Sequence, residues 1–112
     1  MLRSRADFAR IEANGRTRAG RLMVVRFVPN ALGYDRFGFA TGRRIGGSVT
    51  RNRIRRRIRE VLRQSPGHVG AGWDILIVVR PAAAAAPFAE VHRALDRLLG
   101  AVYDSDPMRT PS

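Results

Sequence analysis

Few residues of this 112-residue chain are of the types that carry out acid–base or metal chemistry. It has two histidines, His68 and His92, nine acids and no cysteine. His68 stands in a glycine-containing loop, and His92 lies on the polar side of an expected helix, which favours a solvated surface role for it. No carboxylates cluster as a two-metal nuclease requires, and no phosphate-loop, zinc or G-x-S-x-G motif occurs. We therefore expect neither a catalytic residue nor a metal ligand on this chain.

The chemistry that the sequence does offer is a dense block of arginines between residues 43 and 63. The block holds nine Arg against one acid, Glu60, and so carries most of the formal charge of +12. All 21 basic residues of the chain are Arg. Planar guanidinium groups suit paired phosphate contacts and base stacking, and a field of this sign attracts nucleic acid with release of counterions. A basic membrane-surface protein is the lesser alternative, because no stretch adds the bulky apolar face that such proteins use.

Apolar residues recur inside this arginine block at helical spacing. Five residues fall on one arc when each residue is turned by about 100°: Thr50, Ile54, Ile58, Val61 and Leu62. The pattern predicts a helix over 48–64 that packs this arc on a folded body and holds most arginines on the other arc. Arg51 is expected at the border between the two arcs, where it must reach past apolar neighbours.

The polar arc of this helix has more than charge to offer a nucleic acid. Arg55, Arg59 and Arg63 are four residues apart and form one ridge. Asn52 adds an amide that can donate to and accept from ribose or base edges. The helix N-terminus adds free N–H groups for phosphate. A merely solvated face is the alternative, but Glu60 is the only acid in the block to neutralise it.

The elements that must position this helix follow from the rest of the pattern. Helices are expected over 5–14, with Ser4 as N-cap, and over 88–103, with apolar residues three and four apart. Strands are expected over 17–29, 36–41 and 73–81, with the first two paired as a hairpin. The segment 42–47 is a brief third strand or a turn, and 82–86 is a linker or the start of the last helix. Strand, helix and strand in this order indicate a βαβ unit.

Length and composition restrict the organisation of the chain. We expect one domain over 1–103 with a single modest core and a disordered tail over 104–112. The chain has no run of 18 apolar residues, so we expect no membrane span. Its N-terminal stretch has no long apolar region, so we expect no signal peptide. The absence of cysteine fits a reducing cytoplasm.

Residues 42–60, GRRIGGSVTRNRIRRRIRE, carry a resemblance to a known family. A basic pair followed by Ile-Gly, then Arg-Asn-Arg and an arginine-rich helix, resembles the signature of the protein subunit of bacterial ribonuclease P. The layout around the signature agrees over nearly the whole chain: a short first helix with Asp-Phe, strands, the signature helix, an apolar strand ending in Arg-Pro, and an amphipathic last helix.

The resemblance implies a fold and a function. The fold is α+β, a compact α/β sandwich in the order α-β-β-β-α-β-α, with a left-handed βαβ crossover where a right-handed one is usual. The function is support of an endoribonuclease that matures the 5′ end of precursor tRNA in the cytoplasm, with the chemistry on its RNA subunit. The protein binds that catalytic RNA and grips the 5′ leader of the substrate in a cleft between the sheet and the first helix. Mg²⁺ is held mainly by RNA phosphates, and neither a membrane nor a protein partner is required.

Carried over position by position, the resemblance implies a set of RNA-binding residues: Phe8, Arg43, Arg44, Arg51, Asn52, Arg53, Arg55, Arg56 and Arg59. From the residues alone Phe8 is favoured as core, whereas the resemblance places it in the wall of the leader cleft. Two positions depart from some members of the family, since Glu12 and Arg26 stand where an aromatic residue occurs. These departures make leader stacking a weaker expectation than binding of the catalytic RNA. The alternative is a general RNA-binding protein, such as a ribosomal component, with no part in cleavage.

Overall fold

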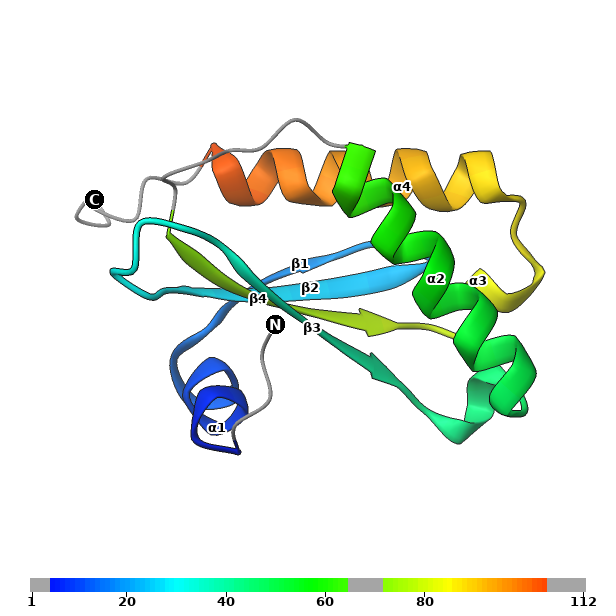
Figure 1. The fold of residues 1–112 in the computed structure, drawn as a ribbon, viewed down its shortest axis with the longest axis horizontal. Coiled ribbons are helices and arrows are strands. Elements are labelled where there is room, and N and C mark those ends of the chain that lie inside the picture. Colours follow the sequence, from blue (N-terminus) through cyan, green and yellow to red (C-terminus); the bar gives the residue numbers. More distant parts are fainter. Residues whose placement is uncertain (1–4, 65–71, 105–112) are drawn as a thin grey trace.

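The computed structural model of the chain describes residues 5–64 and 72–104 and contains one four-stranded sheet with helices on both faces (Figure 1). In chain order the elements are α1 (Arg5–Asn14), β1 (Arg16–Ala19), β2 (Met23–Pro29), β3 (Arg36–Thr41), a 3-10 turn η1 (Arg43–Ile45), α2 (Ser48–Gln64), β4 (Trp73–Val79), α3 (Ala82–Ala85) and α4 (Phe88–Tyr103). The α+β class and the expected element order are confirmed, with η1 and the four-residue α3 added to them.

The strands lie in the order β1-β2-β4-β3. β1 with β2 and β2 with β4 are antiparallel, whereas β3 and β4 are parallel and connected through α2. The predicted βαβ unit is therefore present. The predicted hairpin between 17–29 and 36–41 is wrong, because β4 inserts between β2 and β3. β4 is the most continuously apolar strand, so the centre of the sheet, where both faces are covered, is its natural place.

The segment that was expected to be one strand over 17–29 is a hairpin of two. Residues 20–22 make a tight turn in which the N–H of Gly20 donates to the carbonyl of Met23 over 2.9 Å. Leu22 lies in this turn and is 2 % exposed. It packs with the same core as Met23, although strict alternation would have placed the two on opposite faces.

One face of the sheet is covered by α2 and α4, and the main core lies between them (Figure 1). The strands contribute alternate residues to it: Met23, Val25, Phe27, Trp73, Ile75, Ile77 and Val79. The rings of Phe27 and Trp73 meet edge to face, with centroids 5.2 Å apart. From α4 the buried residues recur three and four apart, as the amphipathic pattern predicted. This core is the rigid support for α2.

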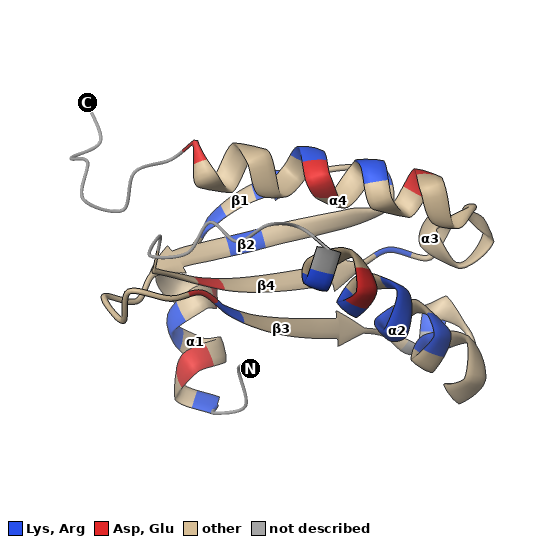
Figure 2. Ribbon diagram, turned by 45° about the horizontal axis from the view of Figure 1, so that its top comes forward, with Lys and Arg blue, Asp and Glu red and all other residues tan. Residues whose placement is uncertain are grey.

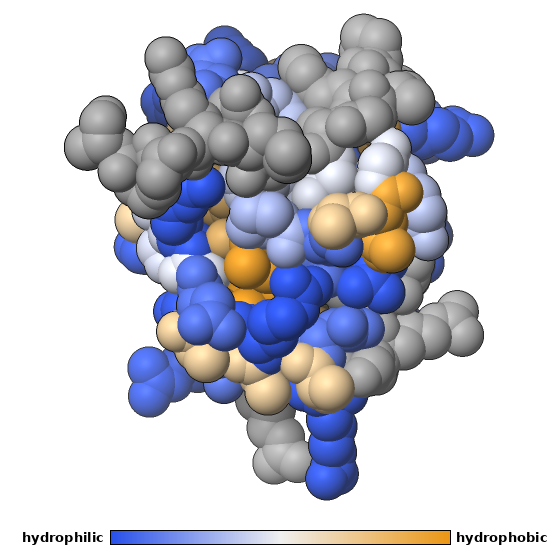
Figure 3. Space-filling model, turned by 90° about the vertical axis from the view of Figure 1, so that its left-hand side faces the viewer, coloured by the Kyte–Doolittle hydropathy of each residue, from blue (hydrophilic) through white to orange (hydrophobic). Residues whose placement is uncertain are grey.

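The opposite face of the sheet carries only α1 among the described helices, at the end where β2 finishes and β4 begins (Figure 1). Ile11, Val28 and Leu76 are buried there, and Phe8, Ala40 and Val78 pack around them half-buried. Figure 3 looks at this end of the molecule and shows a mostly hydrophilic surface with small apolar areas. The apolar side of α1 is thus used against the sheet.

A buried carboxylate fixes α1 on the sheet. Asp74 of β4 is fully buried and accepts hydrogen bonds from Arg36 of β3 over 2.7 and 2.8 Å and from Asn30 over 2.9 Å. Arg10 of α1 also donates to Asp74 and to the carbonyl of Pro29. Arg36 reaches Asp7 of α1 as well, over 3.3 Å. A buried charge without such partners would destabilise the fold, so this network determines where α1 lies.

Most predicted helix boundaries are confirmed, including 5–14, 48–64 and 88–103. The segment 42–47 contains η1 and no strand, and the stretch after β4 forms α3, which is separated from α4 by Ala86 in an extended conformation. Ser4 as N-cap, the loop with His68 and residues 105–112 of the tail expected over 104–112 lie outside the described residues. Within the described part, no helix has the length and apolar character needed to cross a membrane.

Candidate nucleic-acid interface

The arginines of the signature are carried by a helix that is firmly packed on its other side. Ile54, Ile58 and Val61 are at most 2 % exposed and belong to the main core, and Leu62 packs against them half-buried. The predicted apolar arc of α2 is therefore the packed arc. Because α2 cannot rotate without exposing these side chains, its polar arc faces solvent in one orientation.

The chain enters α2 through a turn that depends on glycine. Gly46 has a φ of +138°, and a Cβ at this position would lie 3.2 Å from the Cβ of Thr50. A side chain here would meet both backbone strain and the first turn of α2. Gly46, between the basic pair and Arg-Asn-Arg, therefore sets the direction in which α2 starts.

The structure places most of the predicted RNA-binding residues on the exposed side of α2. Asn52, Arg53, Arg56 and Arg59 are exposed, while Arg51 and Arg55 are half-buried at the flank. Figure 2 shows the basic residues following one another along α2, whereas α4 mixes basic and acidic residues. Arg44 is exposed in η1. Arg43 is in the same turn, and its side chain is outside what the structure describes.

The positive charge of α2 is almost unneutralised. Glu60 forms an ion pair with Arg63 over 2.6 Å, and this pair, with the charge of Glu60, raises the pKa of Arg63. No ion pair within the described residues involves Arg53, Arg56 or Arg59. Unpaired guanidinium groups on a rigid helix are ready donors for phosphate oxygens.

Arg51 has the border position that the helical pattern predicted. It is half-buried, and its Nε has no hydrogen-bond partner in the described part of the chain. A buried N–H without a partner is costly.

Arg59 has an aromatic neighbour that the sequence did not suggest. Its guanidinium carbon lies 5.8 Å from the ring centroid of Phe39 in β3. A cavity of about 180 Å³ opens beside this pair. It is lined by Asp35, Arg36, Phe37, Phe39, Arg59 and Leu62. The sequence predicted only a strand over 36–41 here. The contact between this strand and α2 depends on the place of β3 at the edge of the sheet.

Phe8 was predicted as a core residue from the sequence pattern and as part of the leader cleft from the family resemblance. It is half-buried on α1 and packs on the second apolar cluster of the sheet, so it is part core and part surface. Beyond α1 no described helix covers this face, and Val24, Ala40 and Val78 remain partly exposed. A half-covered apolar sheet face beside an aromatic ring is a surface on which unstacked bases could rest.

Arg26 occupies the same face but is engaged by the protein itself. Its guanidinium donates to the carbonyls of Glu12, over 2.8 Å, and Ile11, over 3.5 Å, at the C-terminal end of α1. The carbonyl of Ile11 also accepts the N–H of Gly15 over 2.7 Å, and a basic side chain at the C-terminal end of a helix stabilises it. The two positions that depart from the family pattern, Glu12 and Arg26, are therefore in direct contact.

The residues for acid–base or metal chemistry are dispersed. His92 pairs with Asp96 one turn further along α4, over 3.1 Å, on the surface. No three His, Cys, Asp or Glu residues of the described ranges gather as a metal site.

Comparison with known proteins matches this arrangement to one family. The family profile described as Ribonuclease P matches residues 1–103. A ribonuclease P protein component of Dehalococcoides mccartyi is 40 % identical over 99 residues, covering 88 % of this chain and 81 % of the relative. The corresponding protein of Acidothermus cellulolyticus is 43 % identical over 103 residues, covering 88 % and 84 %.

Solved structures agree with the sequences. The ribonuclease P protein of Staphylococcus aureus superposes with a TM-score of 0.83 at 28 % identity, covering 90 % of this chain and 93 % of the other. That of Thermotoga maritima gives a TM-score of 0.81 at 32 % identity, covering 88 % and 96 %. The chain therefore belongs to the family of ribonuclease P protein components, the protein subunits of the bacterial endoribonuclease that processes the 5′ ends of tRNAs.

Proposed function

We propose that, in its work with the ribonuclease P RNA, this chain binds that RNA through α2 and the turn before it. The observation that carries the proposal is the row of arginines on a helix whose other side is fixed in the core. Within the described residues, Arg53, Arg56 and Arg59 form no ion pair. The residues assigned to this contact are Arg43, Arg44, Arg51, Asn52, Arg53, Arg55, Arg56 and Arg59. The arginines would bind backbone phosphates, and the Asn52 amide would add a contact to ribose or base edges.

The half-covered face of the sheet is the proposed site for the 5′ leader of precursor tRNA. Phe8 supplies the aromatic surface, and Val24, Ala40 and Val78 supply apolar floor. Arg26 is held by the end of α1, so its charge lies beside this floor. A leader is single-stranded, and a stacking surface next to positive charge is what a single strand binds without sequence preference.

In this proposal Mg²⁺ is bound by the RNA and not by the protein. The described residues gather no carboxylate or histidine set for a metal ion, whereas RNA phosphates are hard oxygen ligands that Mg²⁺ prefers. The chain would then support the reaction by lowering the repulsion between RNA subunit and substrate. Its place of action would be the cytoplasm, where tRNA precursors are made.

A competition titration tests the α2 contact. The chain is titrated into a labelled bacterial ribonuclease P RNA at fixed salt, with unlabelled ribonuclease P RNA or a structured RNA of equal length as competitor. The proposal expects the ribonuclease P RNA to compete at much lower concentration than the unrelated RNA. Equal competition by both would instead favour a general RNA-binding protein.

A further inference from the structure

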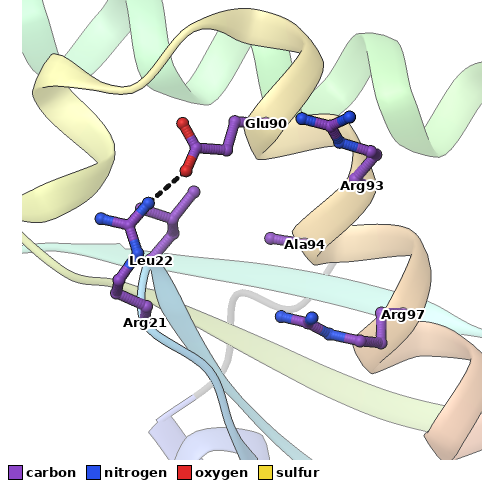
Figure 4. A pocket seen from close by; sticks show the side chains of 6 residues that line it. All are labelled: Arg21, Leu22, Glu90, Arg93, Ala94 and Arg97. Carbon is purple, nitrogen blue, oxygen red and sulfur yellow. Dashed lines mark hydrogen bonds and ion pairs between the residues drawn. The ribbon is translucent and has the colours of Figure 1, made fainter.

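A second group of arginines lies away from α2, in a groove between the β1–β2 turn and α4. The groove encloses a cavity of about 290 Å³. It is lined by Arg21, Leu22, Glu90, Arg93, Ala94 and Arg97. Figure 4 shows Arg21 from the turn and Arg93 and Arg97 from α4 on the two sides of the groove, with α2 behind α4. None of these residues belongs to the arginine block of α2.

The packing of α4 fixes which side chains border the groove. Val91, Leu95 and Leu98 are buried against the sheet. Arg93 and Arg97 are four residues apart and so share one flank of α4. His92 and Asp96 pair on the other flank. Arg93 and Arg97 therefore border the groove together with Glu90, and the pair of His92 and Asp96 does not.

The positive charge of the groove is only partly neutralised. Glu90 forms an ion pair with Arg21, which leaves both groups partly exposed. Arg93 and Arg97 are exposed and form no ion pair with any residue that the structure describes. The groove therefore holds three guanidinium groups against one carboxylate. Two unpaired guanidinium groups one helical turn apart suit the oxygens of a phosphate.

β1 extends this positive surface along the edge of the sheet. All four residues of β1 are exposed, and the sheet has no further described strand beyond it. The guanidinium carbon of Arg16 lies 5.4 Å from the Trp73 ring centroid and that of Arg18 lies 5.7 Å from the Phe27 ring centroid. Both arginines therefore lie on the face that carries α4. A charged backbone could follow Arg16, Arg18 and the groove in turn.

We propose that this groove binds the phosphate backbone of a second segment of the ribonuclease P RNA, distinct from the segment that contacts α2. The proposal rests on the proposed function, which supplies the RNA. A lipid surface fits less well, because the apolar residues of the lining, Leu22 and Ala94, are 2 % and 8 % exposed and cannot insert into a membrane. We expect the contact to follow backbone charge, because the guanidinium groups of the groove outnumber its one carboxylate by three to one.

The absence of cysteine allows a direct test of where the RNA lies. A single cysteine is introduced either at Ala101, one turn beyond Arg97 on α4, or at Val49, which is 82 % exposed in the first turn of α2. Each variant carries a tethered iron chelate that cuts nearby RNA, and is bound to a transcribed bacterial ribonuclease P RNA. The proposal expects both variants to cut, and at separate segments.

An affinity measurement on the same RNA completes the test. The double variant Arg93→Gln/Arg97→Gln should raise Kd about ten-fold and reduce the slope of log Kd against log salt by about 1–2. Arg5→Gln is the matched control, because it removes an exposed arginine from α1, beyond the opposite face of the sheet. It should change Kd less than about two-fold. Arg and Gln have similar helix propensity, so melting temperatures should coincide.

The outcomes separate this proposal from the proposed function. Cuts from Val49→Cys alone, with Arg93→Gln/Arg97→Gln matching the control, would overturn the groove and leave the α2 contact standing. Cuts from both positions at the same nucleotides would likewise overturn a second segment. No cuts from either, with no preference for ribonuclease P RNA over an unrelated RNA, would contradict the proposed function itself.

Discussion

At the scale of single residues, α2 uses one set of side chains to pack on the core and another to present positive charge to solvent. Ile58 and its apolar neighbours attach the helix to the core, while Arg53, Arg56 and Arg59 form no ion pair within the described residues. Arginine is suited to this division because its stem can lie along apolar surface while the planar head reaches outward. Substitutions on the apolar arc should therefore change the stability of the fold, and substitutions on the polar arc should change the affinity for RNA.

Arg59→Ala should weaken binding of ribonuclease P RNA by about 1–3 kcal/mol and lower the salt slope by about 1. Arg59 is exposed and its contact with Phe39 is an exposed cation–π pair, worth about 0.5–1 kcal/mol, so the melting temperature should move little. Arg57→Ala is the matched control on the other flank of α2, outside the assigned contact. A lower melting temperature with unchanged RNA affinity would assign Arg59 to the fold instead.

Ile58→Ala should show the reverse pattern. Ile58 is 0 % exposed, and removing its side chain leaves a cavity under α2. The free energy of unfolding should fall by about 2–5 kcal/mol in urea denaturation. Affinity for RNA, measured where the variant is still folded, should stay within about two-fold of the original. An unchanged stability would show that α2 is not docked through this side chain.

At the scale of elements, α1 depends on charge and α2 on apolar packing. The helix α1 has few buried residues, and its position is set by the arginines around Asp74. Burial alone would raise the pKa of Asp74, but hydrogen bonds from Arg36 and Asn30, with the charges of Arg36 and Arg10, lower it below its ordinary value. The position of α1, and with it the proposed leader site, should therefore depend on this ionised carboxylate.

Asp74→Asn should destabilise the fold in a pH-dependent way. A carboxylate whose pKa is lowered on folding stabilises the protein above its unfolded pKa of about 3.9 and loses that effect as pH falls through the folded value. The variant should lose about 2–4 kcal/mol at pH 7, less than a fully buried pair would because the guanidinium groups reach solvent. Urea denaturation at pH 7, 5 and 3 should show the difference shrinking below about pH 4. A difference that stays constant with pH would contradict this role.

Phe8→Ala should weaken binding of precursor tRNA to the holoenzyme by about 1–3 kcal/mol, the range for loss of one stacked base. Binding of mature tRNA, which has no leader, should not change. Phe8→Leu is the matched control, since it keeps the apolar packing on the sheet and removes the aromatic ring. If the two tRNAs lost equal affinity, or if Leu behaved as Phe, Phe8 would be a packing residue and the leader would lie elsewhere.

At the scale of the whole molecule, the sequence predicted the helices well and the sheet less well. Helical spacing of Ile54, Ile58 and Val61 is a local signal, and it identified α2 together with its exposed face. The hairpin assignment failed because strand neighbours depend on β4, which is distant in sequence from β2 and β3. The contact of Arg59 with Phe39 and the network of Asp74 depend on this strand order, so no local pattern could have revealed them.

The overall charge distribution explains how one small chain can serve a large RNA. Arginines lie on α2, on the flank of α4 and along β1, on the side of the sheet that carries α2 and α4. The opposite face, beside α1, is the half-covered apolar one. The two faces thus suit two ligands, a folded RNA with dense phosphates and a single strand with free bases.

Reconstitution of cleavage tests the central claim most directly. The chain is mixed with a bacterial ribonuclease P RNA, and the rate of 5′ cleavage of a precursor tRNA is measured at low Mg²⁺ with and without the protein. The account predicts cleavage far faster than with the RNA alone, and no cleavage by the protein alone. Cleavage by the RNA that the protein does not stimulate, or cleavage by the protein without RNA, would contradict it.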